Sequence, residues 1–179
     1  SCSVTITFDP TEIASASATL TISDDASGNP HQVSLTGLGT GSQPDGLISR
    51  NRKATTFLGF NIFNATGAGQ EVSAQTARKH KRVFFVRCRN AGNSADTFTV
   101  QGSGDIPQGF SAKYFLGAVH NKYCSACDIT SAVEAGTYKT ATLAPGASTS
   151  DATLIRVELT VDQYAVTGFY SSIITLTST

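Results

Sequence analysis

Ser1-Cys-Ser-Val-Thr-Ile-Thr-Phe-Asp-Pro-Thr11 opens the chain with an apolar side chain at every second position from Val4 to Phe8. The alternation returns at Ser17–Ser23 and Val33–Gly37, where the apolar side chains are Ala18, Leu20, Ile22, Val33 and Leu35. A period of two is typical of a β-strand with one buried and one solvated side. We therefore predict three strands in this segment. So short a sheet leaves its apolar side exposed, and something else must cover it.

Other residues between and around these strands carry a family resemblance. They are Cys2, Pro10-Thr11, Asp24, Pro30 and Gly39-Thr40. In this order, together with the alternating runs, they resemble the C-terminal half of the choice-of-anchor D family, which is similar to the Hydin-type immunoglobulin-like domains of secreted bacterial proteins. The resemblance implies that residues 1–40 form part of an immunoglobulin-like unit. In the family a first sheet and an earlier cysteine precede this segment, so the usual partner of Cys2 is missing here.

Turn-forming residues without periodicity fill positions 41–46, which we predict to be a linker. The second unit is predicted to span residues 47–179. Alternation and turn signals divide it into short strands over 71–77, 83–89, 96–101, 111–115, 154–161 and 171–177, with one helical turn at 128–135. Many short strands without a long helix favour an all-β fold of two immunoglobulin-like β-sandwich units, the first of them incomplete within this chain.

A second resemblance covers residues 47 to 179. Phe57-Leu-Gly-Phe-Asn-Ile-Phe63 and Asn90-Ala-Gly-Asn-Ser-Ala-Asp-Thr-Phe98, with segments 109–115, 128–138 and 143–147, are similar to an uncharacterised immunoglobulin-like module of large secreted proteins from environmental bacteria. The resemblance implies architecture and not chemistry. The chain departs from the module in a cysteine-bearing insertion at 119–127, in Cys88 at a usually apolar position, and in ending where the module continues through one more strand.

Four cysteines, Cys2, Cys88, Cys124 and Cys127, form an even set in a chain of extracellular character, which favours disulfides over free thiols. We expect Cys124 and Cys127 to be oxidised, either with each other or with one of them joined to Cys88 or Cys2. Two alternatives stay open for Cys124-Ser-Ala-Cys127. With His120 and Asp128 it has the look of a metal loop, although structural zinc sites show two ligand pairs. A redox motif needs a thioredoxin-like context, and no helix is expected to follow.

Composition also favours an extracellular or cell-surface location. Charged residues are 15% of the chain and the formal net charge is zero, so the chain has no global electrostatic reason to prefer nucleic acid. No apolar run approaches the roughly 20 residues that a membrane-spanning helix needs, so we expect no membrane insertion. Asn64-Ala-Thr66 has the form of a glycosylation acceptor, which makes Asn64 a candidate glycan site.

The densest charge is Arg78-Lys-His-Lys-Arg82, in which Arg78, Lys79, Lys81 and Arg82 are candidate contacts for a polyanion. Such a cluster suits an anionic polysaccharide, a teichoic or nucleic acid polymer, or an acidic patch on a neighbouring subunit. Without interleaved aromatic residues the nucleic acid version is weak. The structural alternative is a solvated hairpin turn between the strands expected at 71–77 and 83–89.

No motif supports an enzyme, because the sequence has no Gly-x-Ser-x-Gly elbow and no phosphate-binding glycine loop. Asp24-Asp25 suits the turn at 26–30 better than a calcium site. We expect no cofactor, no metal and no catalytic residue. The function expected is that of a subunit of a surface fibre assembled head-to-tail with other copies by strand complementation. Val4, Ile6 and Phe8 are the expected assembly residues. The alternative is an adhesion or polysaccharide-binding module of a larger cell-surface protein.

Overall fold

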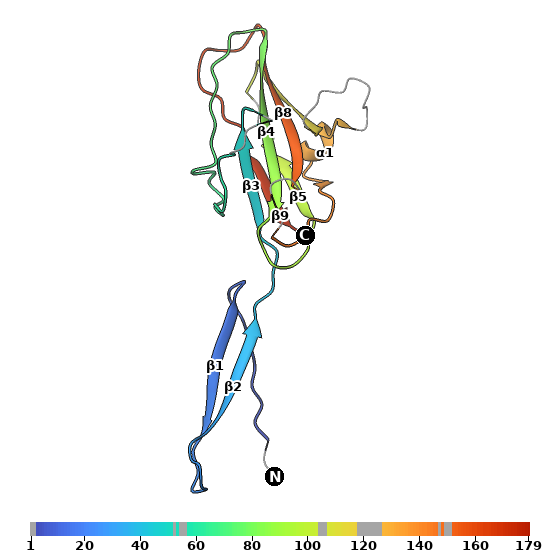
Figure 1. Cartoon of the computed structure of the whole chain (residues 1–179). Helices are drawn as coiled ribbons and strands as arrows, with labels where there is room; N and C mark the ends of the chain where they lie inside the picture. The colour runs from blue at the N-terminus through green and yellow to red at the C-terminus, as the bar shows by residue number, and fades with distance from the viewer. Residues whose placement is uncertain are drawn as a thin grey trace. The chain divides into compact units, whose positions relative to one another are not determined.

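The computed structural model shows an all-β chain, and it describes residues 3–51, 53, 57–103, 107–117, 127–146, 148 and 152–179. The chain divides into two compact units, Ser1–Gly41 (unit 1) and Ser42–Thr179 (unit 2). Each unit is made of antiparallel strands (Figure 1). Within the described ranges the single helix is α1, Thr130–Glu134.

Unit 1 is an antiparallel hairpin of β1 (Ser15–Ile22) and β2 (His31–Leu38). The Asp24 carboxylate holds its turn by accepting a hydrogen bond from the Ala26 amide at 2.9 Å. Asp24 thus serves turn formation, as Asp commonly does. The register opposes Leu20 to Val33 and Ala18 to Leu35, which places these apolar side chains on one face of the ribbon. The other face carries mainly Ser, Thr and Gln.

The strand expected over Ser1–Thr11 does not join this sheet. Residues 3–10 form no strand, and the hairpin has two strands instead of three. Phe8 nevertheless packs on the hairpin, because a Cβ on Gly37 would lie only 2.7 Å from Phe8 Cζ. Alternation shows which side chains face the same way, but a strand also needs a backbone partner.

Unit 2 contains two sheets. The first has the order β3 (Pro44–Ser49), β4 (His80–Asn90), β8 (Thr153–Val161) and β6 (Phe110–Leu116). The second has the order β7 (Tyr138–Lys139), β5 (Phe98–Gly102) and β9 (Ile174–Ser178). Because the core cluster takes members from both sheets and from α1, it lies between them: Phe84, Val86, Cys88, Val100, Ala112, Tyr114, Ile129, Val133, Ile155 and Val157.

Several predicted strands of unit 2 are confirmed and two expectations are wrong. Residues 83–89, 111–115 and 154–161 lie inside β4, β6 and β8, whereas the strands expected at 96–101 and 171–177 begin two and three residues later. The predicted linker at 41–46 instead runs into β3, where Asp45 is fully buried opposite Arg89. Residues 71–77 form no strand. Val72 and Ala74 pack against the core, so their alternation reflects packing and not strand pairing.

Gly102 in β5 is a buried position that has no room for a side chain. A Cβ there would lie 2.4 Å from Tyr114 Oη, and Tyr114 is fully buried and cannot move aside. Gly102→Ala should therefore lower the free energy of unfolding by about 1–3 kcal/mol, as overpacking does. Chemical denaturation followed by circular dichroism measures the loss.

Gly168→Ala is the matched control, because nothing lies within 4 Å of a Cβ at that position. Its stability should change by no more than about 0.5 kcal/mol. Adding Tyr114→Phe to Gly102→Ala removes the clashing oxygen and should restore part of the loss. Equal stability of the two alanine variants would contradict the packing argument.

Candidate functional site

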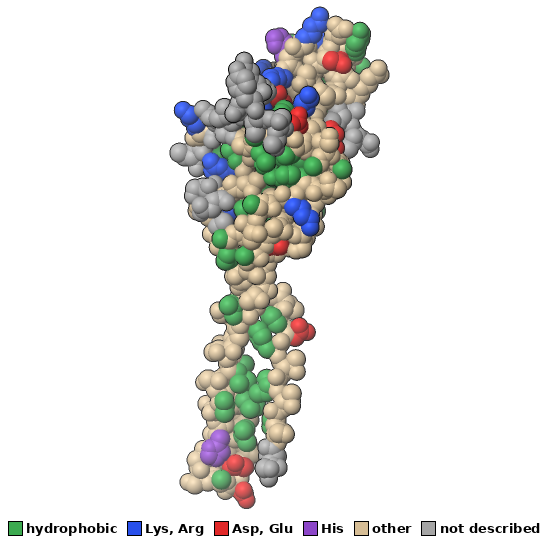
Figure 2. All heavy atoms as spheres, turned by 90° about the vertical axis from the view of Figure 1, so that its right-hand side faces the viewer, with side chains coloured by type: hydrophobic (Ala, Val, Ile, Leu, Met, Phe, Trp, Pro, Cys, Tyr) green, Lys and Arg blue, Asp and Glu red, His purple; other side chains and the backbone are tan. Residues whose placement is uncertain are grey.

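The apolar face of the unit 1 hairpin is the first candidate surface. We group with it the exposed apolar side chains of segment 3–10, which are Val4, Ile6 and Phe8. No hydrophobic side chain among the described residues of unit 1 is buried. Phe8 is 49% exposed, Val33 48% and Ile22 44%, so roughly half of each apolar side chain remains in water. Hydrophobic side chains run along the hairpin in the space-filling view (Figure 2). An amphipathic ribbon of this kind has one apolar and one polar face, as does a sheet whose apolar face packs on a second layer.

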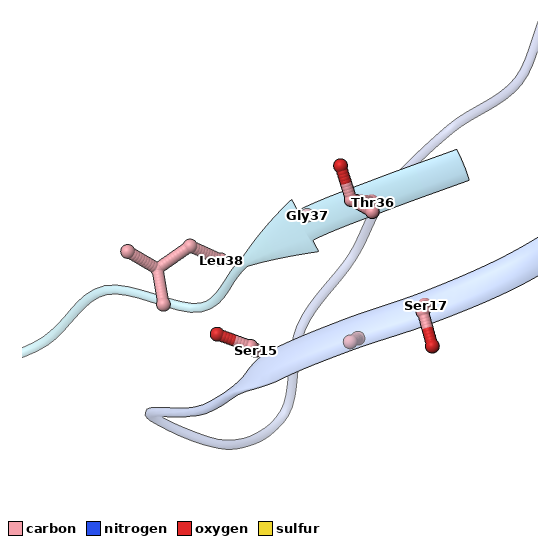
Figure 3. Close-up of a pocket in the computed structure, with 6 residues that line it drawn as sticks. Ser15, Ser17, Thr36, Gly37 and Leu38 are labelled. Carbon is pink, nitrogen blue, oxygen red and sulfur yellow. The ribbon is translucent and has the colours of Figure 1, made fainter. Parts of the chain in front are cut away.

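A hollow at the open end of the hairpin does not form a small-molecule site. It is lined by Ser15, Ala16, Ser17, Thr36, Gly37 and Leu38. Figure 3 shows the hydroxyl groups of Ser17 and Thr36 pointing in opposite directions and not toward a common point. Ligand sites combine apolar walls with convergent polar groups, and this lining has no such convergence.

The basic turn is exposed but is not the solvated hairpin turn that the sequence suggested as an alternative, because residues 71–77 form no strand. Arg78 Nε donates to the Ala165 carbonyl at 2.8 Å, and Arg82 Nε donates to the Gln75 carbonyl at 2.7 Å. Lys81 Nζ pairs with Glu158 Oε2 at 2.8 Å. Lys79 adopts a left-handed φ of 63°. Three of the four candidate polyanion contacts therefore also hold the local structure.

The outer face of the four-stranded sheet carries a buried ion pair that sequence reasoning missed. Arg89 donates to Asp45 Oδ2 from Nη2 at 2.6 Å and from Nε at 3.0 Å. Arg89 Nη2 also donates to Asn61 Oδ1 at 2.5 Å, and its guanidinium lies 4.2 Å from the centre of the Phe60 ring. Arg87 lies in the same way over Phe57, at 4.1 Å. These arginines hold segment 57–61 on the sheet and serve structure.

The cysteines divide into two kinds. Cys88 is a free thiol with no exposed surface, and burial raises its pKa to about 12. Its inclusion among the disulfide candidates was therefore wrong, because it fills a core position between the sheets. Cys127 is disulfide-bonded. Cys2 and Cys124 lie outside the described residues, so the pairing stays a prediction.

The other candidate residues have structural roles in what is described. Asn64 is exposed, and its side-chain amide donates to the Ala68 carbonyl at 2.9 Å while its oxygen accepts from the Thr66 hydroxyl at 2.9 Å. Its glycosylation stays a prediction. Among the described residues no three His, Cys, Asp or Glu side chains gather closely enough to hold a metal ion. His120 of the proposed metal loop lies outside those residues. Within the same ranges no helix combines the length and apolar character that crossing a membrane requires.

Sequence reasoning also missed three exposed hydrophobic residues in the segment between β8 and β9. Tyr164, Val166 and Phe169 are 72%, 78% and 110% exposed, more than any other large hydrophobic side chain in the described part of the chain. The Arg78 to Ala165 hydrogen bond brings this segment beside the basic turn. The signal was present in the sequence as apolar residues without a strand pattern, but their position beside Arg78 follows only from the fold.

Comparisons with protein-family models, with curated proteins and with solved structures found no match to this chain.

Removing the carboxylate of the buried ion pair should be costly. Asp45→Asn leaves the Arg89 guanidinium without its counter-charge, and breaking a buried pair from one side costs about 3–5 kcal/mol. We expect the free energy of unfolding in urea to fall by that amount. Asp25→Asn removes an exposed carboxylate and should leave stability unchanged. Equal stability of the two variants would show that the Asp45 to Arg89 contact contributes nothing to the fold.

Thiol labelling distinguishes the cysteines. A buried thiol with a raised pKa has almost no thiolate at pH 8, so Cys88 should resist iodoacetamide in the native chain and react after denaturation. Cys127 should stay unlabelled in both conditions until a reductant is added. Mass spectrometry of the labelled peptides reads both outcomes. Rapid labelling of Cys88 in the native chain, or of Cys127 without reductant, would contradict this arrangement.

Proposed function

We propose that this chain is a non-enzymatic structural subunit of an extracellular fibre, in which neighbouring copies complete one another's sheets. The observation that carries the proposal is the incompletely covered apolar face of the β1–β2 hairpin. A hairpin alone is marginally stable in water, and a third strand or a covering layer is what gives such a ribbon independent stability. A neighbouring copy is the occupant that the sequence itself can supply.

The energy available for assembly lies in side chains that are now half exposed. Burying a large aliphatic side chain completely is worth about 1.5–3 kcal/mol, so each half-exposed one offers about 1 kcal/mol. Ile22, Val33 and Phe8 together therefore offer several kcal/mol, and Val4 and Ile6 add to this because they are 68% and 51% exposed. Association of two protein surfaces needs such a surplus to offset the lost freedom of motion.

The segment 3–10 has the pattern of a donor strand. It forms no strand with the hairpin, yet it presents Val4, Ile6 and Phe8 at every second position. A strand that adds to a sheet edge gains affinity from backbone hydrogen bonds and specificity from alternate side chains. Contacts of this head-to-tail kind do not close and therefore propagate into a filament.

The finer architecture belongs to the same proposal. Unit 2 packs a four-stranded sheet on a three-stranded sheet around one core, which fits an immunoglobulin-like sandwich. Unit 1 is proposed to be the incomplete second half of another, of the choice-of-anchor D type. Both resemblances are to secreted bacterial modules, which supports an extracellular or cell-surface location. An adhesion module that holds a polysaccharide is the second candidate, and the exposed basic turn favours it.

A charge placed on the apolar side of segment 3–10 should block assembly. Phe8→Asp sets a carboxylate in the proposed interface, where it would be desolvated without a partner. Sedimentation velocity and electron microscopy of the full chain should show filaments for the parent chain and monomers for the variant. All buried hydrophobic residues in the described part of the chain lie in unit 2, so the melting transition of the chain should not change.

Thr7→Asp is the matched control, because it adds the same charge one position away, on the opposite side of an alternating strand. It should leave assembly unaffected. A parent chain that stays monomeric at high concentration would overturn the fibre proposal, and so would equal loss of assembly in the two variants.

A further inference from the structure

Two segments distant in sequence form one surface at an end of the four-stranded sheet. His80, the first residue of β4, pairs with Val161, the last residue of β8. The basic turn 78–82 therefore lies beside the loop 162–170, and the Arg78 to Ala165 hydrogen bond joins them. Figure 1 shows β4 beginning and β8 ending at this end, and Figure 2 shows Lys, Arg, His, hydrophobic and also acidic side chains there. We call this surface, residues 78–82 and 162–170, the basic tip.

The basic tip displays its apolar side chains on an anchored loop. Ala165 is 2% exposed, and its backbone packs so closely on Gly109 that a Cβ there would lie 2.4 Å from Ala165 Cα. The Asp162 amide donates to the Gly109 carbonyl at 2.9 Å, and Tyr170 stacks on Phe110 with 5.0 Å between ring centres. Tyr164, Val166 and Phe169 are thus presented to solvent between fixed points. Exposed apolar groups on a fixed support are typical of an interaction surface.

The charges of the chain are segregated between its units. Unit 1 contains Asp9, Glu12, Asp24 and Asp25 and no Lys or Arg, which gives it a formal charge of −4. The chain has 13 acidic and 13 basic residues, so unit 2 keeps nine acidic residues against all 13 basic ones, a formal charge of +4. The zero net charge therefore conceals an acidic unit and a basic unit. Opposite potentials of this kind steer partners together and set their orientation.

The turn end of the hairpin matches the basic tip in both respects. Ile22 and Val33 lie next to the turn and are 44% and 48% exposed. Asp24 and Asp25 follow Ile22 after one intervening residue, Ser23, and both are exposed. His31 Nε2 lies 3.8 Å from Asp24 Oδ1, while Asp25 stands further along the turn. The hairpin end is therefore apolar and acidic, where the tip is apolar and basic. We call residues 22–25 and 31–33 the acidic end.

We propose that the basic tip of one copy binds the acidic end of the next copy. The three exposed large apolar side chains of loop 162–170 pack on Ile22 and Val33, and the basic turn faces Asp24 and Asp25. This inference rests on the proposed fibre and names one of its contacts. The occupant is a second copy of this chain, because that copy supplies both an apolar surface to cover the exposed side chains of the tip and carboxylates to face its basic turn.

An acidic polysaccharide is the competing occupant. The exposed apolar side chains of loop 162–170 make it the less favoured partner. A polysaccharide supplies the negative charge but no aliphatic side chains to cover Val166 and Phe169. Contacts between two acidic ends or between two basic tips are disfavoured, because like charges repel each other. The contact therefore joins unlike ends, and all copies along a filament point the same way.

A charge-reversal mixture tests this pairing. Asp25→Lys reverses one charge of the acidic end, and Lys79→Glu reverses one charge of the basic tip, at exposed residues that serve neither the Asp24 turn nor the Arg78 anchor. Each variant alone should need about tenfold more protein to form filaments, because like charges then face each other. An equimolar mixture of the two should assemble at the parent concentration. The reversed charge at position 25 of one variant then meets the reversed charge at position 79 of the other, and the two unchanged positions also meet as opposite charges. Lys139→Glu, an exposed reversal on β7, is the control and should assemble as the parent does.

Phe169→Ala removes a fully exposed ring and should weaken assembly without lowering the melting temperature. Normal assembly of both charge variants and of Phe169→Ala would overturn the pairing while leaving the fibre proposal to the Phe8→Asp test. A mixture that fails to assemble when each variant also fails would overturn it as well. A polysaccharide role would also overturn the pairing. In that case the parent chain would retain polygalacturonate, and Lys79→Glu would abolish this retention without changing assembly.

Discussion

An amphipathic sheet must have its apolar face covered, and this constraint explains most of the chain. In unit 2 the constraint is met internally, because two sheets and α1 enclose a common core around Tyr114 and Val133. Unit 1 has one ribbon on which Phe8 packs at Gly37, and none of its described hydrophobic side chains is buried. The same alternating pattern thus produces a covered sheet in one unit and an incompletely covered one in the other. The proposed assembly extends to unit 1 what unit 2 does within itself.

The outer face of the four-stranded sheet meets the constraint in a different way. Its apolar cluster is small, with Leu47, Phe57 and Phe85, and arginines fill the remaining surface with their long stems. Arg89 needs a fixed counter-charge because it is 7% exposed, and Asp45 supplies it from the neighbouring strand. The aromatic rings of Phe57 and Phe60 lie over Arg87 and Arg89 and hold segment 57–61 on the sheet. A buried pair adds little net stability, but its two partners are costly to separate.

Strand positions were predictable from the sequence where alternation coincided with a backbone partner. This holds for β6 and β8, whose central residues alternate and also pair with neighbours on the sheet. In β4 the central residues 83–86 form a continuous apolar run, and the strand pairs with β3 and β8. Alternation fails as a strand signal at 71–77, where Val72 and Ala74 alternate because one side rests on the core. β3 was missed because Pro44-Asp45-Gly46 has the composition of a turn, and only the position of Arg89 in the fold makes a buried Asp45 acceptable. The basic turn was visible in the sequence, whereas its apolar neighbours lie 80 or more positions away and become neighbours through the β4–β8 register.

Two physical terms have separate roles in the proposed fibre. Burial of apolar side chains supplies most of the free energy, but it is non-directional and would equally favour two hairpins packed face to face. Such a symmetric pair would bring two units of charge −4 together, with Asp24 and Asp25 of both copies in proximity. Repulsion between them disfavours the closed dimer, while attraction to a unit of charge +4 favours a contact between unlike ends. The apolar rows therefore set how strongly copies associate. The segregated charges set the polarity, and a polar contact between unlike ends is the kind that continues into a filament.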